Sequence, residues 1–200
     1  SLAWTDKFVR RFGVNEEHPL DFRSPYGCSK GVADQYVLDY ARTYGLRTAT
    51  LRKSCVYGPR QFGCEDQGWL AWFAIAAATG RPITLYGDGL QARDLLHVRD
   101  CVQAYRLAAD YLLGGPPGEA LALNIGGGPG NAASLLEALA AITAADGGDL
   151  PALLAGLRYE PERPGDQRVY VSNVALAEKT LGWRPTVSWP DGVKELGGWV

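Results

Sequence analysis

Helix-like and strand-like segments alternate along almost all of this 200-residue chain. Short β-prone runs cover residues 47–52, 83–86, 121–125 and 168–173. Between and after them, apolar residues recur at helical spacing in residues 25–44, 69–79, 99–113, 134–145, 173–183 and 189–200. Such alternation is typical of α/β proteins with parallel strands. We therefore predict an α/β fold, preceded by an irregular segment over residues 1–23.

The clearest helix start lies in residues 24–31, SPYGCSKG. Ser24 is a favourable N-cap, Pro25 suits the first helical turn, and Gly45 is a typical stop. The spacing predicts that Tyr26 and Lys30, four residues apart, share one face of this helix.

A tyrosine beside a lysine can exchange a proton with an alcohol. A free phenol, with a reference pKa of about 10, is a poor base at neutral pH, but a neighbouring ammonium favours the phenolate. The phenol can then accept a proton as a hydride leaves the alcohol, or return it. The same spacing is common by chance as an exposed aromatic–cation pair, so the context must decide between the two interpretations.

Composition excludes several classes of function. A formal net charge of −2 gives no support for nucleic-acid binding. No apolar run reaches about 18 residues, so we expect no membrane span. The four cysteines form no C-x-x-C pair and only two histidines could join them. We therefore expect no metal site, and reduced thiols in a cytoplasmic protein.

One glycine-rich stretch, NIGGGPGN at residues 124–131, could be mistaken for a dinucleotide-binding loop. It follows a strand and precedes a helix, but Asn131 occupies the third glycine position after Gly126 and Gly128. No acidic residue follows where it could hold a ribose. We interpret this stretch as a structural turn.

Five segments, taken in their order along the chain, carry a resemblance to a known family: SPYGCSK, LRKSCVYGPRQ, GDGLQARDLLHVRDCVQA, NIGGG and PERPGDQR. Over residues 13–200 the chain thereby resembles the extended short-chain dehydrogenase/reductase family, the nucleotide-sugar epimerases and dehydratases. Within that family it is most similar to the CDP-paratose 2-epimerase branch. Residues 20–42, 57–73 and 164–173 carry this finer resemblance.

The resemblance implies the C-terminal half of a Rossmann-type doubly wound parallel sheet plus a small α/β substrate-binding lobe. Residues 1–58 and 94–126 would belong to the Rossmann-type core, and residues 59–93 and 127–200 mainly to the lobe. The N-terminal dinucleotide-binding half, with its glycine-rich turn and catalytic serine or threonine, would be absent. Thr5 is too close to Tyr26 to be that hydroxyl, so we expect this chain alone to be inactive.

The resemblance also implies roles for individual residues. Tyr26 would be the catalytic acid/base, and Lys30 its partner. Both would contact the cofactor, NAD, with Lys53 and Ser54 beside its nicotinamide. The implied substrate-binding residues are Cys55, Gln61, Gln67, Arg93, Arg163 and Asp166.

Within that substrate set, the two arginines would bind the pyrophosphate and Asp166 the nucleotide ribose. Cys55 stands where most members of the family carry asparagine. The nearby Trp69, Trp72 and Phe73 are expected in the core, and so is His97, which we leave out of the catalytic set.

The implied activity is that of an NAD-dependent nucleotide-sugar epimerase that transiently oxidises a sugar carbinol, with C2 of a CDP-linked dideoxyhexose as the inverted carbon. Two alternatives stay open: a dehydratase or reductase of the same family, and a catalytically inactive nucleotide-binding or scaffold domain. Apolar residues on more than one face of residues 32–44 predict a homo-oligomer.

Overall fold

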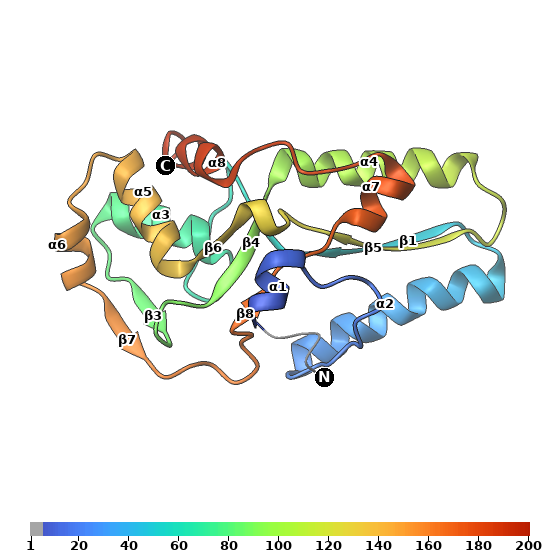
Figure 1. Ribbon diagram of the computed structural model, residues 1–200, viewed down its shortest axis with the longest axis horizontal. Coiled ribbons are helices and arrows are strands. Elements are labelled where there is room, and N and C mark those ends of the chain that lie inside the picture. Colours follow the sequence, from blue (N-terminus) through green and yellow to red (C-terminus); the bar gives the residue numbers. More distant parts are fainter. Residues whose placement is uncertain (1–5) are drawn as a thin grey trace.

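The computed structural model describes residues 6–200, so Thr5 lies outside the described residues. At one end of an elongated molecule, β1 (Thr48–Lys53) pairs in parallel with β5 (Ala120–Ile125). Helix α2 (Pro25–Tyr44) covers one face of this pair, whereas α4 (Val98–Gly114) and α7 (Ala175–Leu181) lie on the other (Figure 1).

The middle of the molecule is organised around β4 (Ala92–His97). This strand pairs in parallel with β2 (Cys55–Tyr57) and β8 (Val169–Tyr170), and antiparallel with β6 (Ala132–Ser134). Helix α1 (Asp6–Phe12) and the 3-10 turn η2 (Pro129–Asn131) lie near this sheet.

The other end is mostly helical. It contains α3 (Trp69–Thr79), α5 (Leu135–Ala145), α6 (Leu150–Ala155) and α8 (Trp189–Gly197). Helix α5 packs against each of the other three (Figure 1). A small parallel pair, β3 (Thr84–Tyr86) with β7 (Arg158–Glu160), lies at its margin.

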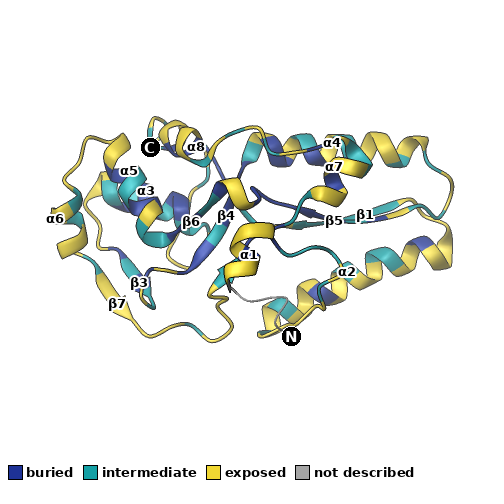
Figure 2. Cartoon of the chain, viewed as in Figure 1, coloured by how far each residue is buried: buried dark blue, intermediate teal, exposed yellow. Residues whose placement is uncertain are grey.

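The buried residues form two hydrophobic clusters that meet at β4. Leu95 belongs to the cluster between α3, α5 and α8, whereas Leu96 belongs to the cluster between β1, β5, α4 and α7. Successive side chains of a strand point to opposite faces, which is why neighbouring residues serve different cores. Figure 2 shows the mostly buried residues of β4 between the two ends.

Local sequence signals explain the well-predicted helices. The Ser24 hydroxyl accepts a hydrogen bond from Gly27 N at 3.0 Å, and Gly45 ends α2 with φ 67°. A positive φ is a conformation that glycine adopts without steric cost. Ser134 and Glu137 form a reciprocal capping box at the start of α5. The predicted start and stop of α2 are confirmed.

Other local predictions were wrong or incomplete. Residues 1–23 are not wholly irregular, because Asp6–Phe12 form α1. The predicted strand at 168–173 is confined to Val169–Tyr170. The helix predicted over residues 173–183 is shorter, because α7 follows its N-cap Val174 and ends at Leu181, although the Asn173 side chain still accepts from Ala175 N at 3.0 Å. The α/β class with mainly parallel pairing is confirmed. The division of the chain into a Rossmann-type core and a substrate-binding lobe stays a prediction.

Candidate functional site

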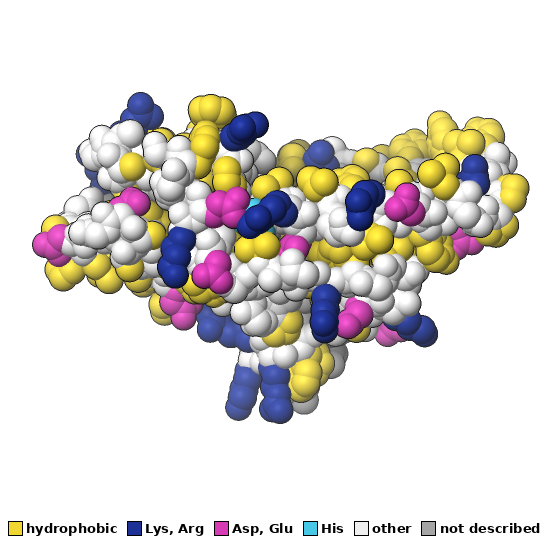
Figure 3. Space-filling model, turned by 90° about the horizontal axis from the view of Figure 1, so that it is seen from above, with side chains coloured by type: hydrophobic (Ala, Val, Ile, Leu, Met, Phe, Trp, Pro, Cys, Tyr) yellow, Lys and Arg dark blue, Asp and Glu magenta, His cyan; other side chains and the backbone are white. Residues whose placement is uncertain are grey.

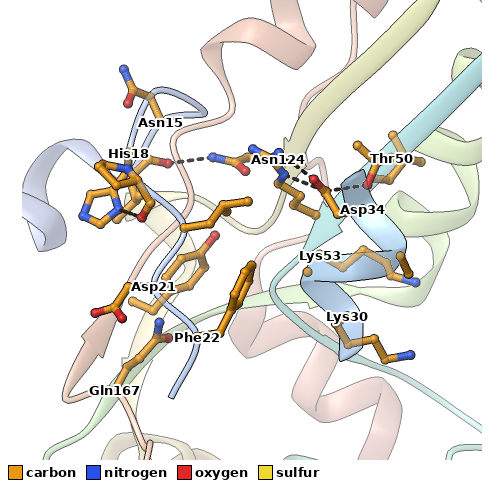
Figure 4. A pocket seen from close by; sticks show the side chains of 18 of the residues that line it. Asn15, His18, Asp21, Phe22, Lys30, Asp34, Thr50, Lys53, Asn124 and Gln167 are labelled. Atoms are coloured by element: carbon orange, nitrogen blue, oxygen red, sulfur yellow. Dashed lines mark hydrogen bonds and ion pairs between the residues drawn. The ribbon is translucent and has the colours of Figure 1, made fainter. Parts of the chain in front are cut away.

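Two neighbouring cavities contain most of the predicted site residues. The larger has a volume of about 760 Å³ and lies between α2, β1 and the segment 14–22 that follows α1 (Figure 4). Tyr26, Lys30 and Lys53 all line it. The sequence-predicted acid/base pair and one predicted cofactor residue therefore share one cavity.

Tyr26 lies in the first turn of α2, where the Ser24 cap and Pro25 fix the start of the helix. Its side chain is 66% exposed, so the phenol is accessible to a ligand. The Lys30 Nζ lies 5.4 Å from the centroid of the Tyr26 ring. One helical turn thus places a cation beside the phenol, as proton exchange with an alcohol requires.

Lys53 brings a second cation to this cavity from the end of β1. Its Nζ donates a hydrogen bond to the Tyr105 hydroxyl of α4 at 2.8 Å. This bond raises the pKa of Lys53, so the side chain stays charged at neutral pH. Lys30 and Lys53 extend in the same direction in Figure 4. In that view both ammonium groups point away from Asn15, His18 and Asp21, which lie on the other side of the cavity.

A half-buried ion pair joins β1 to α2 in the lining of this cavity. Arg52 of β1 contacts the Asp34 carboxylate of α2 through Nε and one terminal nitrogen, both at 2.9 Å. The Thr50 hydroxyl donates to the same carboxylate at 2.7 Å. Together these bonds fix α2, and with it Tyr26 and Lys30, against the strand.

The second cavity has a volume of about 260 Å³ and collects residues from separate segments. Cys55 begins β2, Arg93 lies in β4, and Arg163 and Asp166 come from the loop after β7. Four of the six predicted substrate-binding residues therefore meet at one site.

The two arginines differ in their surroundings. Arg93 is half-buried, burial lowers the pKa of its guanidinium, and one terminal nitrogen donates to Ala92 O at 2.9 Å. Arg163 lies 3.8 Å above the centroid of the Tyr86 ring and 3.0 Å from the Asp66 carboxylate. Two guanidinium groups at one cavity suit a pyrophosphate, because each can pair with two phosphate oxygens.

Cys55 is a neutral thiol in this cavity. Burial raises the pKa of its thiol, and the Trp69 indole N–H donates to Sγ at 2.8 Å. A thiol held in this way fills space beside Trp69 and offers no thiolate nucleophile.

Ser54 lies in the chain between Lys53 of the first cavity and Cys55 of the second, but it is not among the residues that line either one. Its hydroxyl donates to the carbonyl and the carboxylate of Asp94. Asp94 is fully buried, and burial raises the pKa of its carboxyl group.

The two predicted glutamines lie elsewhere. Gln61 Nε2 donates to Val56 O at 3.3 Å, and the Gln67 backbone pairs with that of Cys64. Neither residue is among those that line the two cavities. Their role in substrate binding stays a prediction.

Sequence reasoning missed part of the second cavity. Trp69, Trp72 and Phe73 were expected in the core, and all three pack in or against the α3–α5–α8 cluster, yet they also line the cavity. Tyr86 was missed as well, although its place before the GDG turn was a usable signal.

The glycine-rich stretch is packed shut. Gly126, Gly127 and Gly128 are buried, and the Gly128 N–H donates to the Asp94 carboxylate at 3.0 Å. A Cβ at Gly126 would collide with that carboxylate and with Ser172. The loop therefore offers no open cradle for a phosphate, which favours its interpretation as a structural turn.

Residues 6–200 contain no group of three or more side chains placed to hold a metal ion. Among the same residues, no helix is long and apolar enough to cross a membrane.

A family model described as "NAD dependent epimerase/dehydratase family" matches residues 9–126. Among curated proteins, CDP-paratose 2-epimerase of Salmonella typhi is 41% identical over 193 residues, which cover 94% of this chain and 55% of the relative. A dTDP-glucose 4,6-dehydratase of Actinoplanes is 35% identical over 184 residues, covering 92% of this chain and 53% of that protein. The chain thus spans about half the length of the curated relatives it matches.

Solved structures give the same pattern. The dTDP-glucose 4,6-dehydratase of Bacillus anthracis in complex with NAD has a TM-score of 0.77 and 31% identity, with 94% of this chain and 55% of that one covered. The UDP-glucose 4-epimerase of Thermotoga maritima with UDP-glucose has a TM-score of 0.78 and 31% identity, with coverages of 94% and 57%. These neighbours confirm the Rossmann-type α/β fold class.

Proposed function

Because the chain belongs to the NAD-dependent epimerase/dehydratase family, we propose that it forms the substrate-binding and acid/base part of a nucleotide-sugar epimerase. The cofactor of this family is NAD. The observation that carries the proposal is the convergence of Cys55, Arg93, Arg163 and Asp166 in one cavity, next to the cavity of Tyr26 and Lys30.

The residues present fit one end of the cofactor. Lys30 would hold a ribose hydroxyl, and Lys53 and Ser54, at the end of β1, would contact the nicotinamide. The glycine-rich turn at 126–128 is filled by Asp94 and cannot receive the cofactor pyrophosphate. When bound, NAD supplies the group that takes and returns the hydride.

The protein's own contribution is orientation and proton transfer. Arg93 and Arg163 hold the pyrophosphate, with Asp166 at the nucleotide ribose, so that the sugar lies toward Cys55 and Ser54. Tyr26 accepts the proton of a sugar hydroxyl as the carbinol is oxidised, and Lys30 stabilises the phenolate. The ketone then turns over in the site, so that its other face is reduced, and Tyr26 returns the proton to its oxygen.

We propose a CDP-linked dideoxyhexose as the substrate and C2 as the inverted carbon. Two observations support this choice: 41% identity to a CDP-paratose 2-epimerase, and the small, neutral Cys55 thiol in the second cavity, where most members of the family carry asparagine. We further propose that the protein works in the cytoplasm, where its four free thiols would stay reduced.

A dehydratase is the second candidate, because the dTDP-glucose 4,6-dehydratase of Actinoplanes is 35% identical. The same tyrosine and lysine would serve it. Its distinguishing acidic residues would lie upstream of Tyr26, in the half of the relatives that this chain does not match.

The test is a substrate panel on a full-length protein that contains this chain. CDP-paratose, UDP-glucose and dTDP-glucose are each incubated with the NAD-loaded protein, and the products are followed by proton NMR. We expect inversion at C2 of the CDP-sugar. Loss of water from dTDP-glucose would instead establish the dehydratase, and no turnover of any sugar would favour an inactive binding domain. The 200-residue chain, tested in parallel, should be inactive.

A further inference from the structure

A tight turn between β2 and α3 brings two carboxylates to the second cavity. Cys64 N donates to Gln67 O at 2.9 Å, and Gln67 N donates to Cys64 O at 3.1 Å. This pairing leaves Glu65 and Asp66 at the tip of the turn, and both of them line the cavity. Their carboxylates therefore share the cavity with the two arginines proposed to bind the pyrophosphate.

Each of these carboxylates has a partner in the lining. The Tyr86 hydroxyl donates to the Glu65 carboxylate at 2.8 Å. A terminal nitrogen of Arg163 lies 3.0 Å from the Asp66 carboxylate, and the guanidinium lies 3.8 Å from the centroid of the Tyr86 ring. One carboxylate of the turn thus holds the tyrosine, and the other occupies the arginine above it.

The charge balance of this cavity opposes an anionic ligand. Among residues 6–200, its lining carries two guanidinium groups and three carboxylates, which are those of Glu65, Asp66 and Asp166. Negative groups therefore outnumber positive ones, and a pyrophosphate adds negative charge of its own. Resting on the proposed function, we expect tight binding only after a carboxylate has given up its arginine.

Asp66 is the carboxylate that holds an arginine and can leave it. Its side chain is 85% exposed, whereas that of Arg163 is 34% exposed, so water can take up the released carboxylate. A carboxylate and a phosphate oxygen accept from the same N–H groups of a guanidinium. We propose that Asp66 competes with the pyrophosphate of the substrate for Arg163, and that it thereby lowers the affinity of the site for nucleotide diphosphates.

The opposite role for the same contact would be positioning. A carboxylate that holds the Arg163 guanidinium in place would help the pyrophosphate to bind, and its loss would weaken binding. A carboxylate that competes would hinder the pyrophosphate, and its loss would tighten binding. Replacing Asp66 with asparagine therefore separates the two roles by the sign of the change in affinity.

The experiment measures CDP affinity by isothermal titration of a full-length protein that contains this chain. Asp66→Asn keeps the shape of the side chain and removes its charge. Glu65→Gln removes the same charge from the same turn, and its amide oxygen can still accept from the Tyr86 hydroxyl. Asp88→Asn is the matched control, because Asp88 also forms an exposed ion pair, with Arg168 at 2.9 Å, and is not among the residues that line the cavity.

We expect Asp66→Asn to tighten CDP binding about two- to fivefold, the range that an exposed ion pair contributes. Glu65→Gln should give a smaller gain and Asp88→Asn none, with all thermal midpoints close to that of the wild type. In an Arg163→Ala background, Asp66→Asn should give no gain, because the contested guanidinium is gone. The gain should also shrink at high salt, which screens exposed charges.

CDP affinity in Asp66→Asn that equals or falls below that of the wild type overturns the proposal. An equal gain in Glu65→Gln, or a gain that persists in the Arg163→Ala background, also overturns it, since either result would reflect overall charge alone. These failures differ from failure of the proposed function. CDP binding that depends on Arg163 but not on Asp66 rejects only the competition, whereas a gain in Asp66→Asn without turnover of any nucleotide sugar rejects only the epimerase.

Discussion

At the scale of single residues, Tyr26 carries the proposed chemistry. Replacing it with phenylalanine in the full-length protein removes the only proton of the side chain that can be transferred. Turnover should fall by about 10² or more, whereas substrate affinity should change little. Tyr36→Phe is the control, since Tyr36 is exposed on the same helix and does not line the cavity. Equal turnover in both variants would remove Tyr26 from the mechanism.

Arg93 should matter for affinity. Arg93→Ala removes a half-buried guanidinium from the second cavity, so CDP binding should weaken by roughly 1.5–3 kcal/mol, the range for charged hydrogen bonds. Isothermal titration of the full-length protein measures this difference. Arg81→Ala, at an exposed position after α3, should leave it unchanged. Affinity equal to the wild type in Arg93→Ala would place the pyrophosphate elsewhere.

Single residues also show where sequence reasoning reaches its limit. Tyr26 and Lys30 could be paired from their spacing, because both lie on one helix. Cys55, Arg93 and Arg163 could be grouped only by resemblance, since long-range folding brings their segments together. The contact of Asp94 with Ser54 spans 40 residues of chain, and no local pattern encodes it.

At the scale of secondary-structure elements, the ion pair between α2 and β1 should make stability depend on pH. Arg52 lowers the pKa of Asp34, so the pair stabilises the fold at pH values above the unfolded pKa of aspartate, about 3.9. This contribution is lost as the pH falls through the lower folded value. Asp34→Asn should cost about 2 kcal/mol at pH 7, between the values for exposed and buried pairs.

Urea unfolding of the full-length protein between pH 2.5 and pH 7 measures this pH dependence of the free energy of unfolding. Above about pH 5 the difference in the free energy of unfolding between wild type and Asp34→Asn should be constant, and it should close as the pH falls further. Asp39→Asn is the matched control on α2, because its pair with Arg42 is exposed. A gap that is the same at all pH values would mean that packing, and not the ion pair, joins α2 to β1.

Elements were predictable where the chain itself carries a start and a stop. Ser24 and Gly45 bound α2, and Ser134 begins α5. The short strands β6 and β7 have no such signals, since each has three residues and exists because a neighbouring strand pairs with it. Helix α1 was missed because it has only seven residues, too few for the helical spacing of Phe8, Val9 and Phe12 to repeat.

At the scale of the whole molecule, an apolar stripe on α2 is uncovered. Val32, Tyr36, Tyr40 and Tyr44 follow one another at four-residue spacing, and each is at least 47% exposed. Figure 3 shows the molecule from the side opposite α2, where charged side chains of both signs are interspersed and apolar ones gather toward one end. A stripe of this length would favour association through α2.

We predict that the full-length protein is a homo-oligomer that uses this stripe. Light scattering at micromolar concentration should report more than one copy, and the paired substitutions Tyr36→Glu and Tyr40→Glu should lower the mass toward one copy. Asp39→Asn, on the same helix, should leave the mass unchanged. A monomeric wild type would contradict the prediction, and an oligomer indifferent to the paired substitutions would place the interface elsewhere.

The position of β4 between the two hydrophobic clusters has a consequence for amide hydrogen exchange. Neither cluster can open fully without disturbing Leu95 or Leu96, and three other strands hold β4. Its amides should therefore exchange with deuterium only through global unfolding. The β3–β7 pair is more exposed, so local fluctuations should label it within a much shorter time. Mass spectrometry of the labelled peptides would compare the exchange rates of β4 and of the β3–β7 pair. Amide protons that are retained longest in β4 would identify it as the strand that unfolds last.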